Sequence, residues 1–202
     1  MARWTLLVPV KELSRAKTRL VPPPGVQRAE LARAFALDTV AAAAAAELVE
    51  RVVVVTDDPV LATRLPASAA VLAGGPDGLN PALLHAAREL GAQPVAALTG
   101  DLPGLRSAEL DTALATAAQH ELGAVADAQG TGTTLLAAGH LSSFVPRFGE
   151  GSFAAHCAAG AAALPAGRSV RSDVDTADDL RSAVALGVGP HTAALLADRA
   201  SA

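Results

Sequence analysis

Four basic residues lie within nine positions near the start of the chain, at Lys11, Arg15, Lys17 and Arg19. They follow an apolar run that is typical of a strand, so they stand where the carboxyl end of that strand is expected. Lysine and arginine side chains at such a place can neutralise a polyphosphate and the charge that develops in phosphoryl transfer. The alternative is a solvated basic loop, which is common for one such residue and less common for four.

The lysines of this loop, Lys11 and Lys17, are the only lysines among the 16 basic residues of the chain. The rest of the sequence uses arginine wherever it carries a positive charge. This contrast favours a specific need for a compact ammonium group in the loop, since lysine and arginine are not interchangeable. The alternative is chance within an arginine-biased composition.

Three aspartates form a second group. Asp101 follows a buried apolar run in TGDLPG, and Asp173 and Asp175 stand two positions apart in a segment, 169–176, that reads as a strand. On a strand these two side chains would share a face, with Cα atoms roughly 6–7 Å apart. Carboxylates at neighbouring strand ends favour Mg²⁺, which bridges phosphate oxygens. Asp175 or Thr176 could instead cap the next helix.

Two loops of small residues form a third group, GTGTT at 130–134 and FGEGS at 148–152. Both can present backbone N–H groups to an anion. The second leads into a predicted helix, whose N-terminus would favour a phosphate or carboxylate. Each motif is a weak signal by itself. The five histidines show no metal-ligand spacing, and His156, within that helix, is interpreted as a packing residue.

The elements that would position these groups alternate between strands and helices. Apolar and β-branched runs predict strands at 4–10, 51–56, 69–75, 94–101, 123–127, 133–138 and 169–176. Helical patterns and caps predict helices at 27–46, from 59, at 80–90, 107–120 and 175–187, and after FGEGS. This alternation predicts a doubly wound, mostly parallel α/β sheet, in which ligands bind at the carboxyl ends of the strands. The chemical groups above cluster there.

Composition narrows the class of protein. With 202 residues, 51% hydrophobic and 18% charged, the chain suits a single domain over 1–202 with a packed core. A net charge of −4 and the lack of a long Lys/Arg block disfavour nucleic-acid binding. We expect a cytoplasmic protein, because the N-terminal apolar run suits neither a membrane span nor a signal peptide. The lone Cys157 excludes an internal disulfide and a multi-cysteine zinc site.

Several nucleotide-binding motifs are missing from the sequence. There is no GxxxxGK[ST] loop, which disfavours a P-loop NTPase. GTGTTL lacks the third glycine of a dinucleotide fingerprint and does not open a helix after the first strand. No nucleophile elbow occurs either. These absences disfavour the three corresponding classes of protein.

Taken in order, VPVKELSRAKTRL, GLNPAL, TGDLPGL, GTGTTLL, RFGEGSFAAH and SDVDTADDL resemble the guanylyltransferases of coenzyme F420 (deazaflavin) biosynthesis. Those enzymes act on 2-phospho-L-lactate or, in actinobacteria, on phosphoenolpyruvate. The resemblance runs from about Leu6 to Pro190. It implies the nucleotidyltransferase (nucleotide-diphospho-sugar transferase-like) fold and transfer of GMP from GTP, with release of pyrophosphate. The attacking phosphate is already an anion, so no general base is required.

The resemblance also implies roles for individual residues. Asp101, Asp173 and Asp175 would hold one or two Mg²⁺ ions, and Asp101 and Lys17 would be the catalytic residues, with Lys17 steadying the transition state. The nucleotide would be bound by Lys11, Arg15, Lys17, Gly75 and Asn80. The phosphate or carboxylate of the acceptor would be bound by Thr133 (or Thr134), Gly149 and Ser152.

Two other functions remain open at this level. One is a related enzyme, such as a molybdenum-cofactor or sugar-phosphate nucleotidyltransferase, although the Gly-rich, Arg-containing loop of those enzymes is replaced here by VPVKELSRAKTRL. The other is a non-catalytic nucleotide-binding module, which would be expected to lack the acids or lysines. The acceptor stays open among phosphoenolpyruvate, 2-phospho-L-lactate and 3-phosphoglycerate, although an Arg- and Ala-rich composition favours the first. A homodimer, and hand-over of the product to the next deazaflavin enzyme, are compatible with the sequence.

Overall fold

The computed structural model describes residues 3–10 and 20–200, with side chains as far as residue 197. The basic positions of the first loop, Lys11, Arg15, Lys17 and Arg19, lie outside the described residues. Their roles therefore stay predictions.

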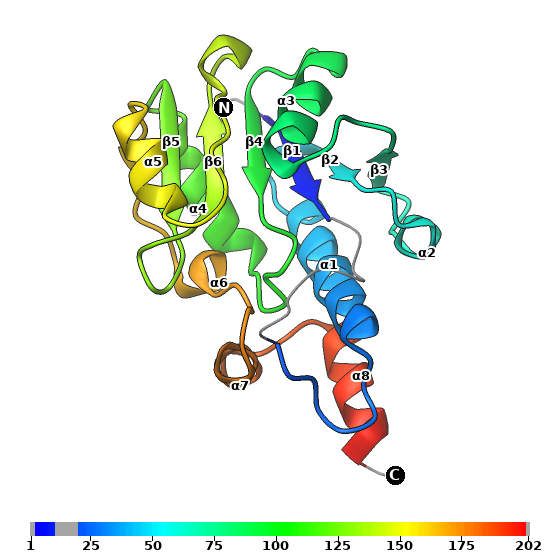
Figure 1. Cartoon of the computed structure of the whole chain (residues 1–202). Coiled ribbons are helices and arrows are strands. Elements are labelled where there is room, and N and C mark those ends of the chain that lie inside the picture. The colour runs from blue at the N-terminus through cyan, green and yellow to red at the C-terminus, as the bar shows by residue number, and fades with distance from the viewer. Residues whose placement is uncertain (1–2, 11–19, 201–202) are drawn as a thin grey trace.

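Seven strands form a sheet in the order β3-β2-β1-β4-β6-β5-β7 (Figure 1). They are β1 (Trp4–Pro9), β2 (Val49–Val55), β3 (Ala69–Leu72), β4 (Val95–Leu98), β5 (Leu122–Ala126), β6 (Thr133–Ala138) and β7 (Ala162–Ala163). Among the described strands only β6 runs antiparallel to its neighbours, β4 and β5. The predicted mostly parallel α/β sheet is confirmed.

The helices follow most of the predicted segments. They are α1 (Arg28–Ala44), α2 (Pro59–Ala62), α3 (Leu79–Glu89), α4 (Ser107–Ala117), α5 (Ser152–Ala158), α6 (Arg168–Arg171), α7 (Ala177–Leu186) and α8 (Pro190–Ala200), with a 3₁₀ turn η1 (Leu141–Ser143). Asp58 caps α2 as predicted, because its Oδ1 accepts from the backbone N–H groups of Val60 and Leu61. None of the described helices has the length and apolar character needed to cross a membrane.

Helices cover both faces of the sheet (Figure 1). The continuous run Val52, Val53 and Val54 in β2 is buried throughout because successive side chains point to opposite faces. Val52 and Val54 belong to the core under α1 and α4, while Val53 belongs to the core under α3. The core is made almost entirely of Leu, Val and Ala, as the 2% aromatic content requires.

A third hydrophobic cluster joins α1 to the C-terminal helices. It includes Phe35 of α1, Val174 from the stretch before α7, and Leu180 of α7. Leu195 of α8 packs against it. Asp38 of α1 accepts hydrogen bonds from the first backbone N–H groups of α8, at His191 and Thr192 (2.9 and 2.8 Å). This helix was not predicted from the sequence.

One prediction about secondary structure was wrong. The segment 169–176 is not a strand: the short helix α6 is followed by an irregular stretch at 172–175. The reason is a helix-to-helix contact, in which both the backbone N–H and the hydroxyl of Ser169 donate to Glu109 Oε2 of α4 at 2.8 Å. The alternation of apolar and polar residues in this segment therefore comes from burial of Val170 and Val174 on either side of a bend. It does not come from pairing with a neighbouring strand.

Candidate functional site

Polar side chains at the ends of three neighbouring strands, β4, β6 and β5, lie together at one end of the sheet. β6 lies antiparallel between β4 and β5, so its first residue, Thr133, is at the edge where those two strands end. Asp101 comes shortly after β4, and Asp127 directly follows β5. The strand order therefore places one acid on each side of the threonine that opens β6, Asp101 on one side and Asp127 on the other.

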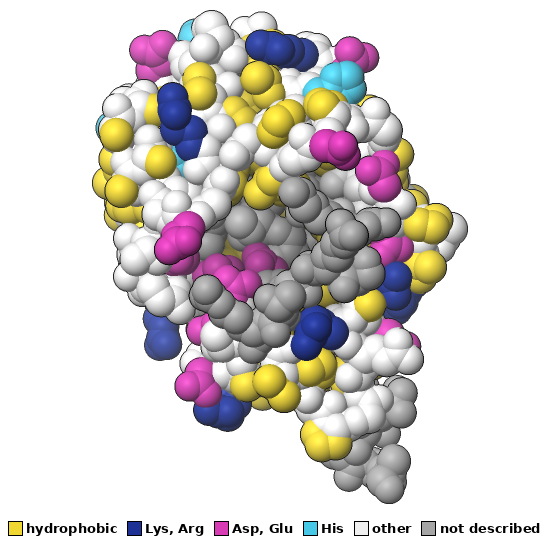
Figure 2. All heavy atoms as spheres, in the orientation of Figure 1, with side chains coloured by type: hydrophobic (Ala, Val, Ile, Leu, Met, Phe, Trp, Pro, Cys, Tyr) yellow, Lys and Arg dark blue, Asp and Glu magenta, His cyan; other side chains and the backbone are white. Residues whose placement is uncertain are grey.

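Asp173 shows that the predicted acids have been brought together. Burial and, after it, the negative charges of Asp101, Asp175 and Asp127 together raise the pKa of Asp173 to about 8. The three predicted aspartates thus share one electrostatic environment, together with a fourth that the sequence analysis did not single out. The space-filling view shows acidic side chains gathered in a hollow of the face in view (Figure 2).

A backbone contact holds the irregular stretch against the end of β4. The N–H of Val174 donates to the carbonyl oxygen of Asp101 at 3.1 Å, and the Val174 side chain is fully buried. Thr176 caps α7, and Asp179 completes a capping box with it. The cap of α7 is therefore supplied by Thr176, and Asp175 is not needed for it.

The acids suit a hard cation in chemical type. Carboxylate oxygens are the ligands that Mg²⁺ and Mn²⁺ prefer. Asp173 Oδ1 is buried and accepts no hydrogen bond from any residue that the structure describes, which leaves an acceptor for a cation to satisfy. Within residues 3–10 and 20–200, however, no three His, Cys, Asp or Glu side chains are already arranged as metal ligands.

Asp127 shapes the loop that carries GTGTT. Its Oδ1 accepts from the backbone N–H of Thr131 (2.8 Å) and its Oδ2 from that of Gly132 (2.7 Å). A Cβ atom added to Gly132 would lie 2.5 Å from Asp127 Oδ2, so any larger residue here would displace the carboxylate that holds the turn. The sequence signal for this role was an aspartate followed by a Gly-rich turn, because Asp side chains commonly bond the backbone of the turns that follow them.

A β-bulge in β6 separates the roles of its two threonines. Ala126 of β5 pairs with Thr133 and Val125 with Leu135, so Thr134 is the extra residue. The bulge places Thr133 on the face that α5 covers, and its Oγ1 is 2.9 Å from Nδ1 of His156. Thr134 Oγ1 is buried without a hydrogen bond from the residues described.

The loop that carries Gly149 and Ser152 is held from two sides. The backbone N–H of Arg147 donates to Nε2 of His156 (2.8 Å). The next peptide pairs with Asn80 at the start of α3: the Phe148 N–H donates to Asn80 Oδ1 (2.7 Å), and Asn80 Nδ2 donates to the Phe148 carbonyl (3.0 Å). Asn80 therefore links the predicted nucleotide side of the site to the predicted acceptor side.

Gly149 and Ser152 follow within this loop. Gly149 has a φ of 143°, a conformation that side chains disfavour. Ser152 is 2% exposed, opens α5, and donates its backbone N–H to the Gly149 carbonyl. Gly75 lies in the turn before α3, close to the ring of His85. The described site residues are thus distributed along the strand edge and the two loops beside it.

The comparisons with known proteins decide the family. A family model described as "Guanylyl transferase CofC like" matches residues 4–198. This chain belongs to the CofC-like guanylyltransferase family. That membership supports guanylyltransferase activity for the chain.

Relatives of this CofC-like chain cover nearly all of it. The phosphoenolpyruvate guanylyltransferase of Thermomonospora curvata is 53% identical over 202 aligned residues, which cover 96% of this chain and 89% of the relative. That of Streptomyces scabiei is also 53% identical, over 208 residues that cover 96% of each. The family resemblance drawn from the ordered motifs is confirmed.

Solved structures agree on the fold of this CofC-like protein. A nucleotidyl transferase from Methanothermobacter has a TM-score of 0.58 at 20% identity, with 90% of this chain and 96% of the other covered. The Rv0371c protein of Mycobacterium tuberculosis, crystallised as a complex with manganese, has a TM-score of 0.56 at 19% identity, with 92% and 100% covered. At these identities the likeness shows the nucleotidyltransferase fold.

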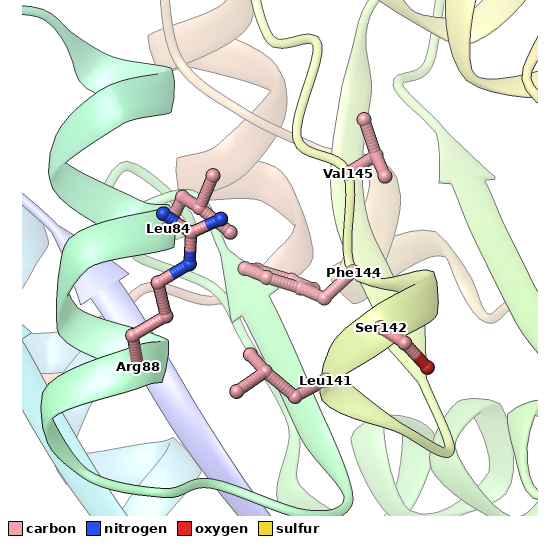
Figure 3. A pocket seen from close by; sticks show the side chains of 6 residues that line it. All are labelled: Leu84, Arg88, Leu141, Ser142, Phe144 and Val145. Atoms are coloured by element: carbon pink, nitrogen blue, oxygen red, sulfur yellow. The ribbon is translucent and has the colours of Figure 1, made fainter.

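A separate cavity of about 340 Å³ lies at the opposite end of these strands, where β4 begins and β6 ends. Phe144 points toward Leu84 and Arg88 of α3 across this cavity (Figure 3). The remaining lining residues are Leu141, Ser142 and Val145. None of the described residues that line it carries a carboxylate, and it lies at the opposite end of β4 from Asp101, so it is not part of the acidic site.

Proposed function

We propose that this CofC-like protein transfers GMP from GTP to phosphoenolpyruvate and releases pyrophosphate. The observation that carries the proposal is the meeting, at one strand edge, of the acids around Asp173 with the hydroxyl of Thr133 and the loop of Ser152. An anionic triphosphate and an anionic acceptor need such a divided site, with acids for a bridging cation on one side and neutral donors on the other. The 53% identical relatives named for this reaction support the choice of substrates.

In the proposed reaction a phosphate oxygen of phosphoenolpyruvate attacks the α-phosphorus of GTP. The new bond joins the two phosphorus atoms through oxygen, and the bond between the α-phosphorus and the β-bridging oxygen breaks. Pyrophosphate takes the electron pair and leaves. Because the nucleophile is already an anion, the protein's work is to position the two substrates and to stabilise charge.

We assign the metal role to Asp101, Asp173 and Asp175. A bound Mg²⁺ would neutralise charge on the phosphates of GTP. The three carboxylates fit this role in donor type, and the buried Asp173 Oδ1 supports it as an acceptor that the described residues leave unused. Asp127 would add negative charge near these carboxylates while its side chain holds the GTGTT turn.

The other roles follow the family resemblance. We propose that Lys17 stabilises the transition state, with Lys11 and Arg15 near the phosphates. We propose Gly75 and Asn80 beside the guanosine, where Asn80 would act chiefly through its pairing with Phe148. Thr133, Gly149 and Ser152 are proposed to bind the acceptor's phosphate or carboxylate.

We further propose that the product feeds coenzyme F420 biosynthesis in the cytoplasm, by hand-over to the next deazaflavin enzyme. The resemblance in the ordered motifs supports this placement. In that setting 2-phospho-L-lactate is the alternative acceptor, since it differs from phosphoenolpyruvate by one double bond.

Pyrophosphate release tests the proposal. Purified protein with Mg²⁺ is incubated with GTP and, in turn, phosphoenolpyruvate, 2-phospho-L-lactate and 3-phosphoglycerate, with ATP and CTP run beside GTP. The proposal predicts release with GTP and phosphoenolpyruvate. Pyrophosphate release with ATP or CTP but not with GTP would contradict it, and so would no release with any of the acceptors.

A further inference from the structure

His156 occupies the point where the two halves of the acceptor side meet. Its side chain is fully buried in α5. Both ring nitrogens are engaged, Nδ1 with Thr133 Oγ1 at 2.9 Å and Nε2 with the backbone N–H of Arg147 at 2.8 Å. One imidazole therefore connects the opening of β6 to the loop that carries Gly149 and Ser152.

The hydrogen bonds fix the protonation state of the ring. A backbone N–H can only donate, so Nε2 is an acceptor and carries no proton. In the neutral ring the proton is then on Nδ1, and Nδ1–H donates to Thr133 Oγ1. Burial, with the Arg147 guanidinium, lowers the pKa of His156 to about 4, while the Ser152 carbonyl acts in the opposite direction. The ring is therefore neutral at physiological pH.

This arrangement has a consequence for the threonine hydroxyl. Thr133 Oγ1 receives a hydrogen bond from His156, so its own proton is left for another acceptor. An oxygen that accepts one hydrogen bond is a stronger donor in the next, because hydrogen-bond chains polarise one another. A phosphate or carboxylate oxygen of the acceptor would be bound by such a donor.

The second bond acts on the loop. Gly149 and Gly151 both have positive φ, so the backbone between Arg147 and Ser152 contains two positions of wide conformational freedom. The Arg147 N–H is held by Nε2 of His156, and the following peptide is held by Asn80. These contacts fix the position at which the loop begins. The glycines of the loop do not restrict its conformation by themselves.

We propose that His156 is a positioning residue for the phospho-acid acceptor, which aims the Thr133 hydroxyl and fixes the Gly149–Ser152 loop at the same time. This inference rests on the proposed function. A packing role is the competing explanation, because the ring also meets Phe148 edge-on at a centroid distance of 5.2 Å. Packing alone would make either nitrogen dispensable.

Two substitutions separate the two hydrogen bonds. In His156→Asn the side-chain amide can donate near the place of Nδ1 and cannot reach the place of Nε2. In His156→Gln the amide oxygen can accept from Arg147 near the place of Nε2, and the donor to Thr133 is lost. The matched controls are His120→Asn and His120→Gln, at an exposed histidine after α4.

The readout is the KM for each substrate in the pyrophosphate assay. Loss of either hydrogen bond should raise the KM for phosphoenolpyruvate about tenfold, with the KM for GTP changed less than about twofold. The His120 controls should match wild type. An equal rise for both substrates, or no rise in folded variants, would overturn the inference.

A double-mutant cycle tests the link to Thr133. Thr133→Val should raise the KM for phosphoenolpyruvate in the wild type and in His156→Asn, but add little in His156→Gln, which has already lost the donor. Additive effects in both backgrounds would overturn the inference. Where the His156 variants do not fold, Thr133→Ser should keep a near-wild-type KM and Thr133→Val should not; equal KM values would overturn it.

The two levels of failure are distinct. A wild type that is inactive with every acceptor overturns the proposed function and this inference with it. An active wild type whose His156 variants behave like the His120 controls overturns this inference alone.

Discussion

The backbone N–H of Val174 donates a 3.1 Å hydrogen bond to the carbonyl oxygen of Asp101. Val174 is also fully buried, so its neighbours Asp173 and Asp175 are held beside the end of β4. The bond joins two segments that are far apart in the sequence. It explains how acids from a strand end and from an irregular stretch come to share one electrostatic environment.

Asp101→Asn should lower the rate of pyrophosphate release by at least about a hundredfold, because it removes a carboxylate from the proposed cation site. The far-UV spectrum and melting temperature should stay close to wild type. Asp178→Asn is the matched control, since Asp178 is exposed on α7 and, among the described residues, its carboxylate pairs with nearby Arg181. Full activity in Asp101→Asn would remove Asp101 from the metal assignment.

The pKa of Asp173 predicts how stability depends on pH without metal. Its folded pKa of about 8 lies above the ordinary value of 3.8, so the native state binds the proton more tightly than the unfolded state does. The stabilisation is full below pH 3.8 and is lost as pH rises toward 8. Asp173→Asn should therefore melt at a higher temperature than wild type at pH 8 in chelator, and the difference should shrink toward pH 4. A difference that grows toward pH 4 would contradict this.

Ser152→Ala should weaken binding of the acceptor more than binding of the nucleotide. Ser152 is nearly fully buried at the start of α5, beside the loop of Gly149. Loss of one hydrogen bond to an anion should raise the KM for phosphoenolpyruvate about tenfold or more, measured by pyrophosphate release at saturating GTP. A larger rise in the KM for GTP would mean that the two subsites are exchanged.

Gly132→Ala should destabilise the fold by about 1–3 kcal/mol, because a Cβ atom there would press on Asp127 Oδ2. The same contact should disturb the turn that leads to Thr133 and so lower activity. Gly139→Ala is the control, since a Cβ atom at Gly139 meets nothing within 4 Å. Urea unfolding of the two variants measures the difference, and equal midpoints would show that the Asp127 turn yields without cost.

Much of the fold could be predicted because the local sequence patterns match the burial and the element boundaries that the sheet imposes. β-branched runs such as that of β2 match a strand buried on both faces, and Asp58 with Pro59 marks the start of α2. The segment 169–176 was mistaken for a strand because alternating burial also arises when a chain bends between two cores. α8 escaped prediction, since its N-terminus is capped by Asp38, a residue distant in sequence.

The site was predictable in its ordered motifs and less so in its connections. The acids were identified because they follow apolar runs, but Asp127 was not, since an aspartate before a Gly-rich turn looks like an ordinary turn residue. His156 was interpreted as packing. Its ring does pack on Phe148, but its two nitrogens bond Thr133 and Arg147, contacts that depend on a bulge and a loop that no local pattern predicts.

Analysis of the product tests the central claim most directly. GTP, phosphoenolpyruvate, Mg²⁺ and the protein are incubated, and the mixture is followed by phosphorus NMR and mass spectrometry. The claim predicts pyrophosphate together with an equal amount of a diphosphate that joins guanosine to the enol acid. Pyrophosphate accompanied only by GMP, or GTP left unchanged, would contradict it.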